Sequence, residues 1–246
     1  GNTGSSSLDF TTDAQLPGLR IDTVAGDDVI NVIEHAQNLI VSGSSTDLAA
    51  GSTVTVTING KIYSATVLAD GTWQAAVPAA DVSQWADGSL DIKASAQDPS
   101  GNPVTIGTIV DVDLAPVAVS INSVTADNVL NAAEKGQDLV LSGSSANVEA
   151  GQTVTITFAG KTYTTTVNAN GDWTYTVPAA DLSGLKDGDA SVQVSVSNVN
   201  GNAASSAQEF SVDTAAPTVT INTISGDNML NAAEAAQDLT LSGTST

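Results

Sequence analysis

Apolar and polar residues alternate along most of the chain, which is the pattern of β-strands with one buried face and one solvated face. The clearest stretches are 154–158, 173–177 and 192–196, where Val, Ile, Phe, Trp or Tyr side chains alternate with Thr, Gln or Ser. Clusters of Gly, Asn, Asp and Lys, which favour turns, separate such stretches at 159–161, 170–172 and 200–202. The pattern therefore predicts short antiparallel strands.

Seven strands are expected in a stretch of about 100 residues, near 117–124, 138–145, 153–159, 161–167, 172–178, 190–197 and 204–212. One helical turn is expected at 131–134, where the sequence reads Asn-Ala-Ala-Glu. About seven short strands in such a length are typical of an immunoglobulin-like β-sandwich. We therefore predict an all-β fold of seven-strand sandwiches.

The sequence repeats itself with an offset of 100 residues. The segment 26–31 returns at 126–131 and at 226–231, and Trp73 returns as Trp173 without any insertion. Such periodicity indicates a tandem array of similar units. We predict two complete repeats at 14–113 and 114–213, the last strand of a preceding repeat at 1–13, and the first strands of a following repeat at 214–246. Short junctions around Pro17, Pro116 and Pro217 favour a linear, rod-like array.

Composition restricts the partners of the chain. It carries 27 acidic and 6 basic residues, a net charge of −21, and no Cys. This charge repels phosphate, so nucleic acid and anionic membrane surfaces are poor partners, and we predict that the chain neither binds nucleic acid nor inserts into a membrane. The apolar runs are too short to insert into a membrane. The same acidity suits Ca²⁺, which prefers carboxylate, amide and carbonyl oxygens.

Topology places several of the acidic residues near one another. In a sandwich of this kind, the loop between the first two strands and the end of the last strand lie at the exit end, facing the next repeat. The next repeat presents the loop before its own last strand, 98–102 or 198–202. Crowded carboxylates repel one another unless a cation neutralises them. We therefore predict Ca²⁺ at the junctions, and the candidate ligands are Asp13, Asp98, Asp27, Asp28, Glu34, Asp113, Asn198, Asn200, Asp127, Glu134 and Asp213. In the competing interpretation these Asp and Asn residues form turns and the Glu residues cap a helical turn.

Other conspicuous side chains have simpler interpretations. Trp73 and Trp173 alternate with their strands and are expected in the core, and Trp85 is expected to pack on the end of its domain. His35 becomes Lys135 and Ala235 in the other repeats, and we expect it to be exposed. With one His and no Cys, the chain has neither a His-based metal site nor a thiol nucleophile. Pairs such as Asp87 and Asp91 border a strand with no sign of a glycosidase cleft, and we predict that the chain is not an enzyme.

The residues that recur at each junction carry a family resemblance. Segment 211–217 (Ser-Val-Asp-Thr-Ala-Ala-Pro) leads through 219–221 to Gly226-Asp227-Asn228 and 230–234, and complete repeats add motifs such as 170–173 and 177–178. Together they resemble the bacterial Ig-like repeats of giant type I-secreted adhesins, over essentially the whole chain. The resemblance implies a secreted stalk held at the bacterial cell surface and stiffened by Ca²⁺. It also implies contact with a host cell surface through the parent protein.

Two other functions stay open at this point. The chain could be a carbohydrate-binding module that holds host glycans through exposed Trp or Tyr side chains, or an accessory segment of a glycosidase. A glycan array with this chain would separate the stalk from the module. Binding that is abolished when an exposed Trp is replaced would favour the module, and no binding would favour the stalk.

Overall fold

The computed structural model describes residues 3–246. The chain divides into two compact units. The first contains the chain as far as Ala118 together with Ala146–Gln152 and Val196–Ala204, and the second contains Val119–Ser145, Thr153–Ser195 and Ser205–Thr246. Each predicted complete repeat forms a sandwich of two sheets, so the predicted all-β, Ig-like fold is confirmed.

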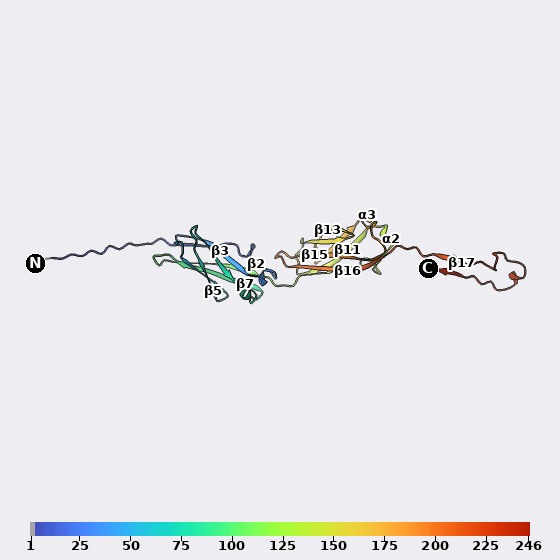
Figure 1. Ribbon diagram of the computed structural model, residues 1–246, viewed down its shortest axis with the longest axis horizontal. Coiled ribbons are helices and arrows are strands. Elements are labelled where there is room, and N and C mark those ends of the chain that lie inside the picture. The colour runs from blue at the N-terminus through green and yellow to red at the C-terminus, as the bar shows by residue number, and fades with distance from the viewer. Residues whose placement is uncertain (1–2) are drawn as a thin grey trace. The chain divides into compact units, whose positions relative to one another are not determined.

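The first repeat is built from eight strands in two sheets (Figure 1). One sheet has the order β1-β3-β6, with bounds Gly18–Ile21, Leu39–Thr46 and Thr72–Val77. The other has the order β2-β8-β7-β4-β5, with bounds Val29–Ile30, Pro103–Val112, Gly88–Gln97, Thr53–Ile58 and Lys61–Thr66. Two short helices join strands, η1 at Glu34–Ala36 and α1 at Ala79–Val82.

The second repeat has the same plan. Its sheets are β9-β11-β14 and β10-β16-β15-β12-β13. In chain order its elements are β9 Ala118–Val119, β10 Val129–Asn131, α2 Ala132–Lys135, β11 Leu139–Ala146, β12 Thr153–Phe158, β13 Lys161–Thr166, β14 Asp172–Val177, α3 Ala179–Leu182, β15 Gly188–Ser197 and β16 Ala203–Asp213.

The structure differs from the prediction at the start of each sandwich. The strand expected near 117–124 is only β9, and the chain then crosses to the other sheet and forms β10. The crossing explains the difference, because the apolar residues before residue 124 pack in one sheet and those after it pack in the other. The helical turn predicted at 131–134 is confirmed as α2, whereas α1 and α3 were not predicted.

A Trp on the strand before α1 or α3 fills each core. Trp73 and Trp173 are 0% and 2% exposed, as predicted. Each packs against a Gly of the neighbouring strand. A Cβ on Gly43 would lie 1.9 Å from the carbonyl oxygen of Arg20 and 2.4 Å from the Trp73 ring. Gly43 and Gly143 are therefore required by the close approach of the backbone and the indole.

The segments at the two ends of the described chain are not part of the two sandwiches. Residues 3–13 form neither helix nor strand, and residues 1 and 2 of the strand predicted at 1–13 lie outside the described residues. After the second sandwich, β17 Val219–Ile221 pairs with β18 Gly243–Ser245, and η2 spans Glu234–Ala236. Ile221 and Leu241 are 76% and 66% exposed there, whereas Leu141, which matches Leu241, is 1% exposed.

Candidate functional site

The structure brings Asp113 together with the loop at 198–202, and both lie in the first compact unit. The side-chain amides of Asn198 and Asn200 donate to Asp113 Oδ2 at 3.1 and 2.7 Å. The side-chain amide of Asn202 donates to the Asp113 carbonyl at 3.0 Å, and its Oδ1 accepts the Val32 N–H at 2.8 Å. We call Asp113, Asn198, Asn200 and Asn202 the Asp113 cluster. The bond from Asn200 is the main reason that the pKa of Asp113 lies below its usual range.

A matching group surrounds Asp13. The Ser100 hydroxyl donates to Asp13 Oδ2 at 2.8 Å, and the side-chain amide of Asn102 lies 3.3 Å from the Asp13 carbonyl oxygen. The same Asn102 amide donates to Asp98 Oδ2 at 2.8 Å, and this bond lowers the pKa of Asp98. We call Asp13, Asp98, Ser100 and Asn102 the Asp13 cluster.

Position 98/198 holds its loop in shape in both repeats. Asp98 Oδ1 accepts the N–H groups of Ser100 and Asn102, and Asn198 Oδ1 accepts those of Asn200 and Asn202. Because Asn198 Oδ1 is committed to two N–H donors, its amide nitrogen must face Asp113. Asp98 and Asn198 are 8% and 6% exposed, so these bonds satisfy nearly buried polar groups.

The remaining predicted ligands of the first junction bond within their own loop. Asp27 Oδ1 accepts the Val29 N–H at 3.0 Å, Asp28 Oδ1 accepts the Val24 N–H at 2.8 Å, and Glu34 Oε2 accepts the Asn31 N–H at 3.2 Å. These are the turn and capping roles of the competing interpretation.

The second repeat shows the same arrangement. Asp127 Oδ1 accepts the Val129 N–H at 3.0 Å, and Glu134 forms a capping box with Asn131 at the start of α2. Asp213 pairs with Asn131 across β16 and β10, and its Oδ1 accepts the Ala215 N–H. Within residues 3–246, no three Asp, Glu, His or Cys side chains come together in an arrangement that could hold a metal ion.

The two clusters differ in how well their polar atoms suit Ca²⁺ as ligands. The Asp13 cluster offers two carboxylates, a hydroxyl and a backbone carbonyl, which are the oxygen ligands that Ca²⁺ prefers. In the Asp113 cluster a single carboxylate already receives two amide N–H groups. The residues of the Asp13 cluster therefore fit a Ca²⁺ ion better than those of the Asp113 cluster.

Sequence reasoning did not find a second set of polar contacts, which fasten the end of each repeat. Asp87 Oδ1 accepts the N–H of Leu114, the first residue after the Asp113 position, at 2.6 Å. Asp187 Oδ1 accepts both the N–H and the hydroxyl of Thr214, at 3.0 and 2.6 Å. The recurrence of Asp-Gly at 87–88 and 187–188 was the signal that could have revealed this role.

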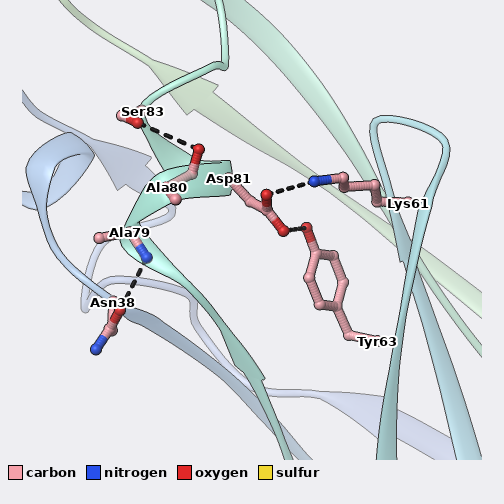
Figure 2. A network of polar contacts seen from close by, with 7 residues as sticks. All are labelled: Asn38, Lys61, Tyr63, Ala79, Ala80, Asp81 and Ser83. Carbon is pink, nitrogen blue, oxygen red and sulfur yellow. Dashed lines mark hydrogen bonds and ion pairs between the residues drawn. The ribbon is translucent and has the colours of Figure 1, made fainter.

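A polar network also recurs around α1 and α3. Figure 2 shows the carboxylate of Asp81 on α1 facing Lys61 and Tyr63 of β5. The Tyr63 hydroxyl donates to Asp81 Oδ2 at 2.9 Å, and burial together with this bond raises the pKa of Tyr63 to about 12. Asn38 Oδ1 accepts the Ala79 N–H at 2.8 Å (Figure 2). Lys161, Tyr163 and Asp181 make the same contacts in the second repeat.

Among the described residues, the Trp side chains and the hydroxyls of Tyr63 and Tyr163 are engaged within the fold rather than exposed to a sugar. All three Trp residues are buried, including Trp85 at 4% exposure, and the hydroxyls of Tyr63 and Tyr163 are bound to Asp residues. The prediction that His35 is simply exposed is wrong. It is half-buried, and its Nε2 lies 3.0 Å from the Trp85 carbonyl oxygen. Lys135 reaches the Leu185 carbonyl at the matching place.

Comparison with known proteins shows the class of protein to which this chain belongs: tandem bacterial Ig-like repeats of large adhesins. The sequence profile described as the bacterial Ig-like domain matches residues 123–214. A Ca²⁺-stabilised adhesin that helps an Antarctic bacterium reach out and bind ice is 37% identical, with a TM-score of 0.54. That comparison covers 96% of this chain and 59% of the adhesin chain, so this chain spans less than two thirds of its relative.

A 1.5-MDa bacterial ice-binding adhesin, whose structure was studied for host cell surface retention, is 34% identical, with a TM-score of 0.51. Here 96% of this chain and 77% of the other are covered. This chain therefore belongs to the bacterial Ig-like domain family, and its repeats are structural rather than enzymatic, as predicted.

A comparison of the sequence with curated proteins found no match. Among the described residues no helix is long and apolar enough to cross a membrane.

Proposed function

We propose that this chain is a stalk segment of a large, secreted bacterial adhesin and that Ca²⁺ binding stabilises it. The observation that carries the proposal is the pair of clusters in which the end of one repeat meets a loop of the next through Asp13 or Asp113. The 37% identity to an adhesin described as Ca²⁺-stabilised supports the choice of ion. The parent protein would be held at the bacterial surface, as the 1.5-MDa adhesin is described to be.

In this proposal the residues nearest the ion are Asp13 and Asp98 in one cluster and Asp113, Asn198 and Asn200 in the other. Asp213 would take the same role toward a following repeat. Asp27, Asp28, Glu34, Asp127 and Glu134 would contribute any oxygen that their own loops leave free. A bound Ca²⁺ would supply positive charge against the carboxylates, and the protein's own amides already hold the loops in place.

Three finer points belong to the same proposal. Export by type I secretion and contact with a host cell surface follow from the family resemblance. The individual protein that we propose as the nearest kin is SiiE, the giant non-fimbrial adhesin of Salmonella. Neighbouring repeats of the same chain are the direct partners of this segment.

Calorimetric titration of the whole chain with Ca²⁺ tests the proposal. We expect binding that is lost in part when Asp13 is replaced by Ala and in part when Asp113 is replaced by Ala. Extracellular Ca²⁺ modules bind with Kd values of roughly 10⁻⁴–10⁻³ M, so the titration must reach millimolar concentrations. Small-angle scattering in millimolar Ca²⁺ and in EGTA then measures whether the ion changes the extension of the chain. A titration without binding heat and identical scattering curves would refute the role of Ca²⁺.

A further inference from the structure

Three Asn residues of the chain are followed directly by Gly, a pair in which the Asn amide is open to attack by the backbone. They are Asn59, Asn170 and Asn200. Gly has no Cβ, so its backbone nitrogen reaches the side chain of the preceding Asn with little steric hindrance. The structure holds the three pairs in different ways, so their reactivity must differ.

Two of the three pairs are held by hydrogen bonds. The Gly171 N–H donates to the Asn168 carbonyl at 3.1 Å, and the Gly201 N–H donates to the Asn198 carbonyl at 3.2 Å. The Asn side chain of the latter pair also donates to Asp113 Oδ2 at 2.7 Å. In both pairs the backbone nitrogen that would attack is occupied, and a hydrogen bond must break before it can move.

The pair at 59–60 is free of such bonds. Asn59 and Gly60 form the two-residue turn between β4 and β5, in which Ile58 and Lys61 face each other. Both turn residues have positive φ, 47° and 76°, as a type I′ turn requires. Both are exposed, and among the described residues neither the Gly60 N–H nor the Asn59 side chain makes a hydrogen bond.

A flip of the peptide plane between these two residues prepares the reaction. It turns the type I′ turn into a type II′ turn, which keeps the outer pairing of the hairpin and has a ψ of about −120° at the first turn residue. At this ψ the Gly60 nitrogen lies beside the Asn59 side chain, where a succinimide ring can close. The flip breaks no hydrogen bond, because this peptide plane makes none.

We propose that Asn59 is a site of spontaneous deamidation. The Gly60 nitrogen bonds to Cγ of Asn59, and the side-chain nitrogen leaves with the proton of the Gly60 N–H as ammonia, so that a succinimide remains. One water molecule then opens the ring at either of its carbonyl carbons and leaves aspartate or isoaspartate at position 59. The reaction needs no oxidant, metal or enzyme, and the proposal goes beyond the stalk function and does not depend on it.

The reaction alters the edge of the five-stranded sheet. Either product adds a negative charge, and isoaspartate carries the backbone through the side chain and so lengthens a turn that fits only two residues. β5, the outermost strand, then loses part of its pairing with β4.

The second repeat cannot react in this way. Ala159, with a φ of 51°, stands in the matching turn and has no amide to lose. Because Ala is strained at positive φ, the second repeat has a less favourable turn that is chemically inert. The two repeats thus hold the same hairpin with a reactive residue in one and an inert residue in the other.

Peptide mapping by mass spectrometry tests the proposal on the whole chain. The chain is kept folded in neutral buffer, and the mass gain that accompanies conversion of an amide to an acid is followed at Asn59, Asn170 and Asn200. We expect Asn59 to react roughly tenfold faster than the other two, each of which must first break a hydrogen bond. In guanidinium chloride, where the chain is unfolded, the three rates should become similar. Equal rates in the folded chain, or a difference that persists in the unfolded chain, would overturn the proposal.

The two repeats provide matched variants. Asn59→Ala copies the turn of the second repeat and should abolish the reaction in the first, whereas Ala159→Asn should bring it to the second repeat at the rate of Asn59. In chain that has reacted at Asn59, hydrogen exchange should be faster over 61–66 than in fresh protein and unchanged over 161–166. No reaction in Ala159→Asn would show that the geometry of this turn does not promote the chemistry.

Discussion

The loops at 98–102 and 198–202 occupy the same place in successive repeats, yet they are held in different ways. Both loops bond Asp98 or Asn198 Oδ1 through two backbone N–H groups, and in the first loop the Asn102 amide also bonds the Asp98 carboxylate, while Ser100 donates to Asp13. In the second loop the side-chain amides of Asn198, Asn200 and Asn202 all donate to Asp113 instead. The amide of Asn198 can donate a hydrogen bond to a neighbouring Asp, whereas the carboxylate of Asp98 can only accept one. The side chain at position 98/198 therefore determines whether a neighbouring Asp is bound or repelled.

The largest expected effect follows from replacing the carboxylate that the second loop needs. Asp113→Ala removes the acceptor of two side-chain amides, and hydrogen bonds to charged groups contribute about 1.5–3 kcal/mol each when largely desolvated. We expect the free energy of local opening of loop 198–202 to fall by about 2 kcal/mol, seen as faster hydrogen exchange of that segment. Asp13→Ala is the matched variant, and loop 98–102 should exchange nearly as slowly as before. Equal acceleration in both loops would contradict the difference described here.

The second-largest effect is expected when the side chains at position 98/198 are exchanged between the two repeats. Asn198→Asp would place a second carboxylate against Asp113, where an amide now donates. Without Ca²⁺ the two charges repel, and with Ca²⁺ they provide another ligand, so we expect about tenfold tighter Ca²⁺ binding. Asp98→Asn should weaken binding at the Asp13 cluster by a similar factor. Calorimetry on both variants measures this, and unchanged affinity in both would show that position 98/198 is not near the ion.

Acid should weaken both loops, through different carboxylates. Hydrogen bonds from Asn102 and Asn200 hold the pKa values of Asp98 and Asp113 below their usual range in the folded chain. A carboxyl group with a lowered folded pKa stabilises the fold above its unfolded pKa of about 3.9, and this stability disappears as the pH falls through the folded pKa. We therefore expect loops that are unchanged at pH 5 and loosened below about pH 4. In Asp113→Asn the NMR shifts of residues 198–202 should lose this acid transition, while those of 98–102 keep it.

The smallest expected effect concerns one backbone N–H. The Val199 N–H donates to Glu149 Oε2 at 3.0 Å. The matching residues are Pro99, which has no N–H, and Ala49. We expect Glu149→Ala to cost roughly 0.5–1 kcal/mol of loop stability, measured by hydrogen exchange of segment 196–204.

The double variant Glu149→Ala with Val199→Pro removes the donor together with its acceptor and should recover most of that loss. Ala49→Glu in the first repeat is the control and should change nothing, because Pro99 offers no donor. A double variant that is no more stable than Glu149→Ala would argue against this pairing.

The sequence predicted most of the fold because alternation and exact repetition are long-range patterns with many independent residues. Six of the seven strands expected in the second repeat appear close to their predicted bounds. The first was mispredicted because its crossing to the other sheet depends on a turn at Asn128, which alternation does not register. The helices α1 and α3 are single turns after Pro78 and Pro178, too short to show a helical period.

The candidate site was predicted less completely. Topology suggested that Asp113 meets the loop at 198–202, because strand ends and loops at the ends of a sandwich follow from strand order, and hydrogen bonds join the two in the structure. It could not show that Asp27, Asp28 and Glu34 turn toward backbone N–H groups of their own loop, since that choice depends on local backbone angles. The direction of the Asn198 amide likewise depends on two hydrogen bonds that only coordinates reveal.

The contact between Asp81 and the strand β5 bears on how the chain avoids aggregation. β5 is the outermost strand of its five-stranded sheet, and such a strand exposes N–H and C=O groups to which another chain can add as an extra strand. Lys61 and Tyr63 tie α1 to this strand in the first repeat, and Lys161 and Tyr163 tie α3 to β13 in the second. An array of many similar sandwiches multiplies its exposed sheet edges with every repeat. A small helix tied to the β5 and β13 edges would keep these strands from adding to those of another chain, so that such an array could grow long without its repeats joining into aggregates.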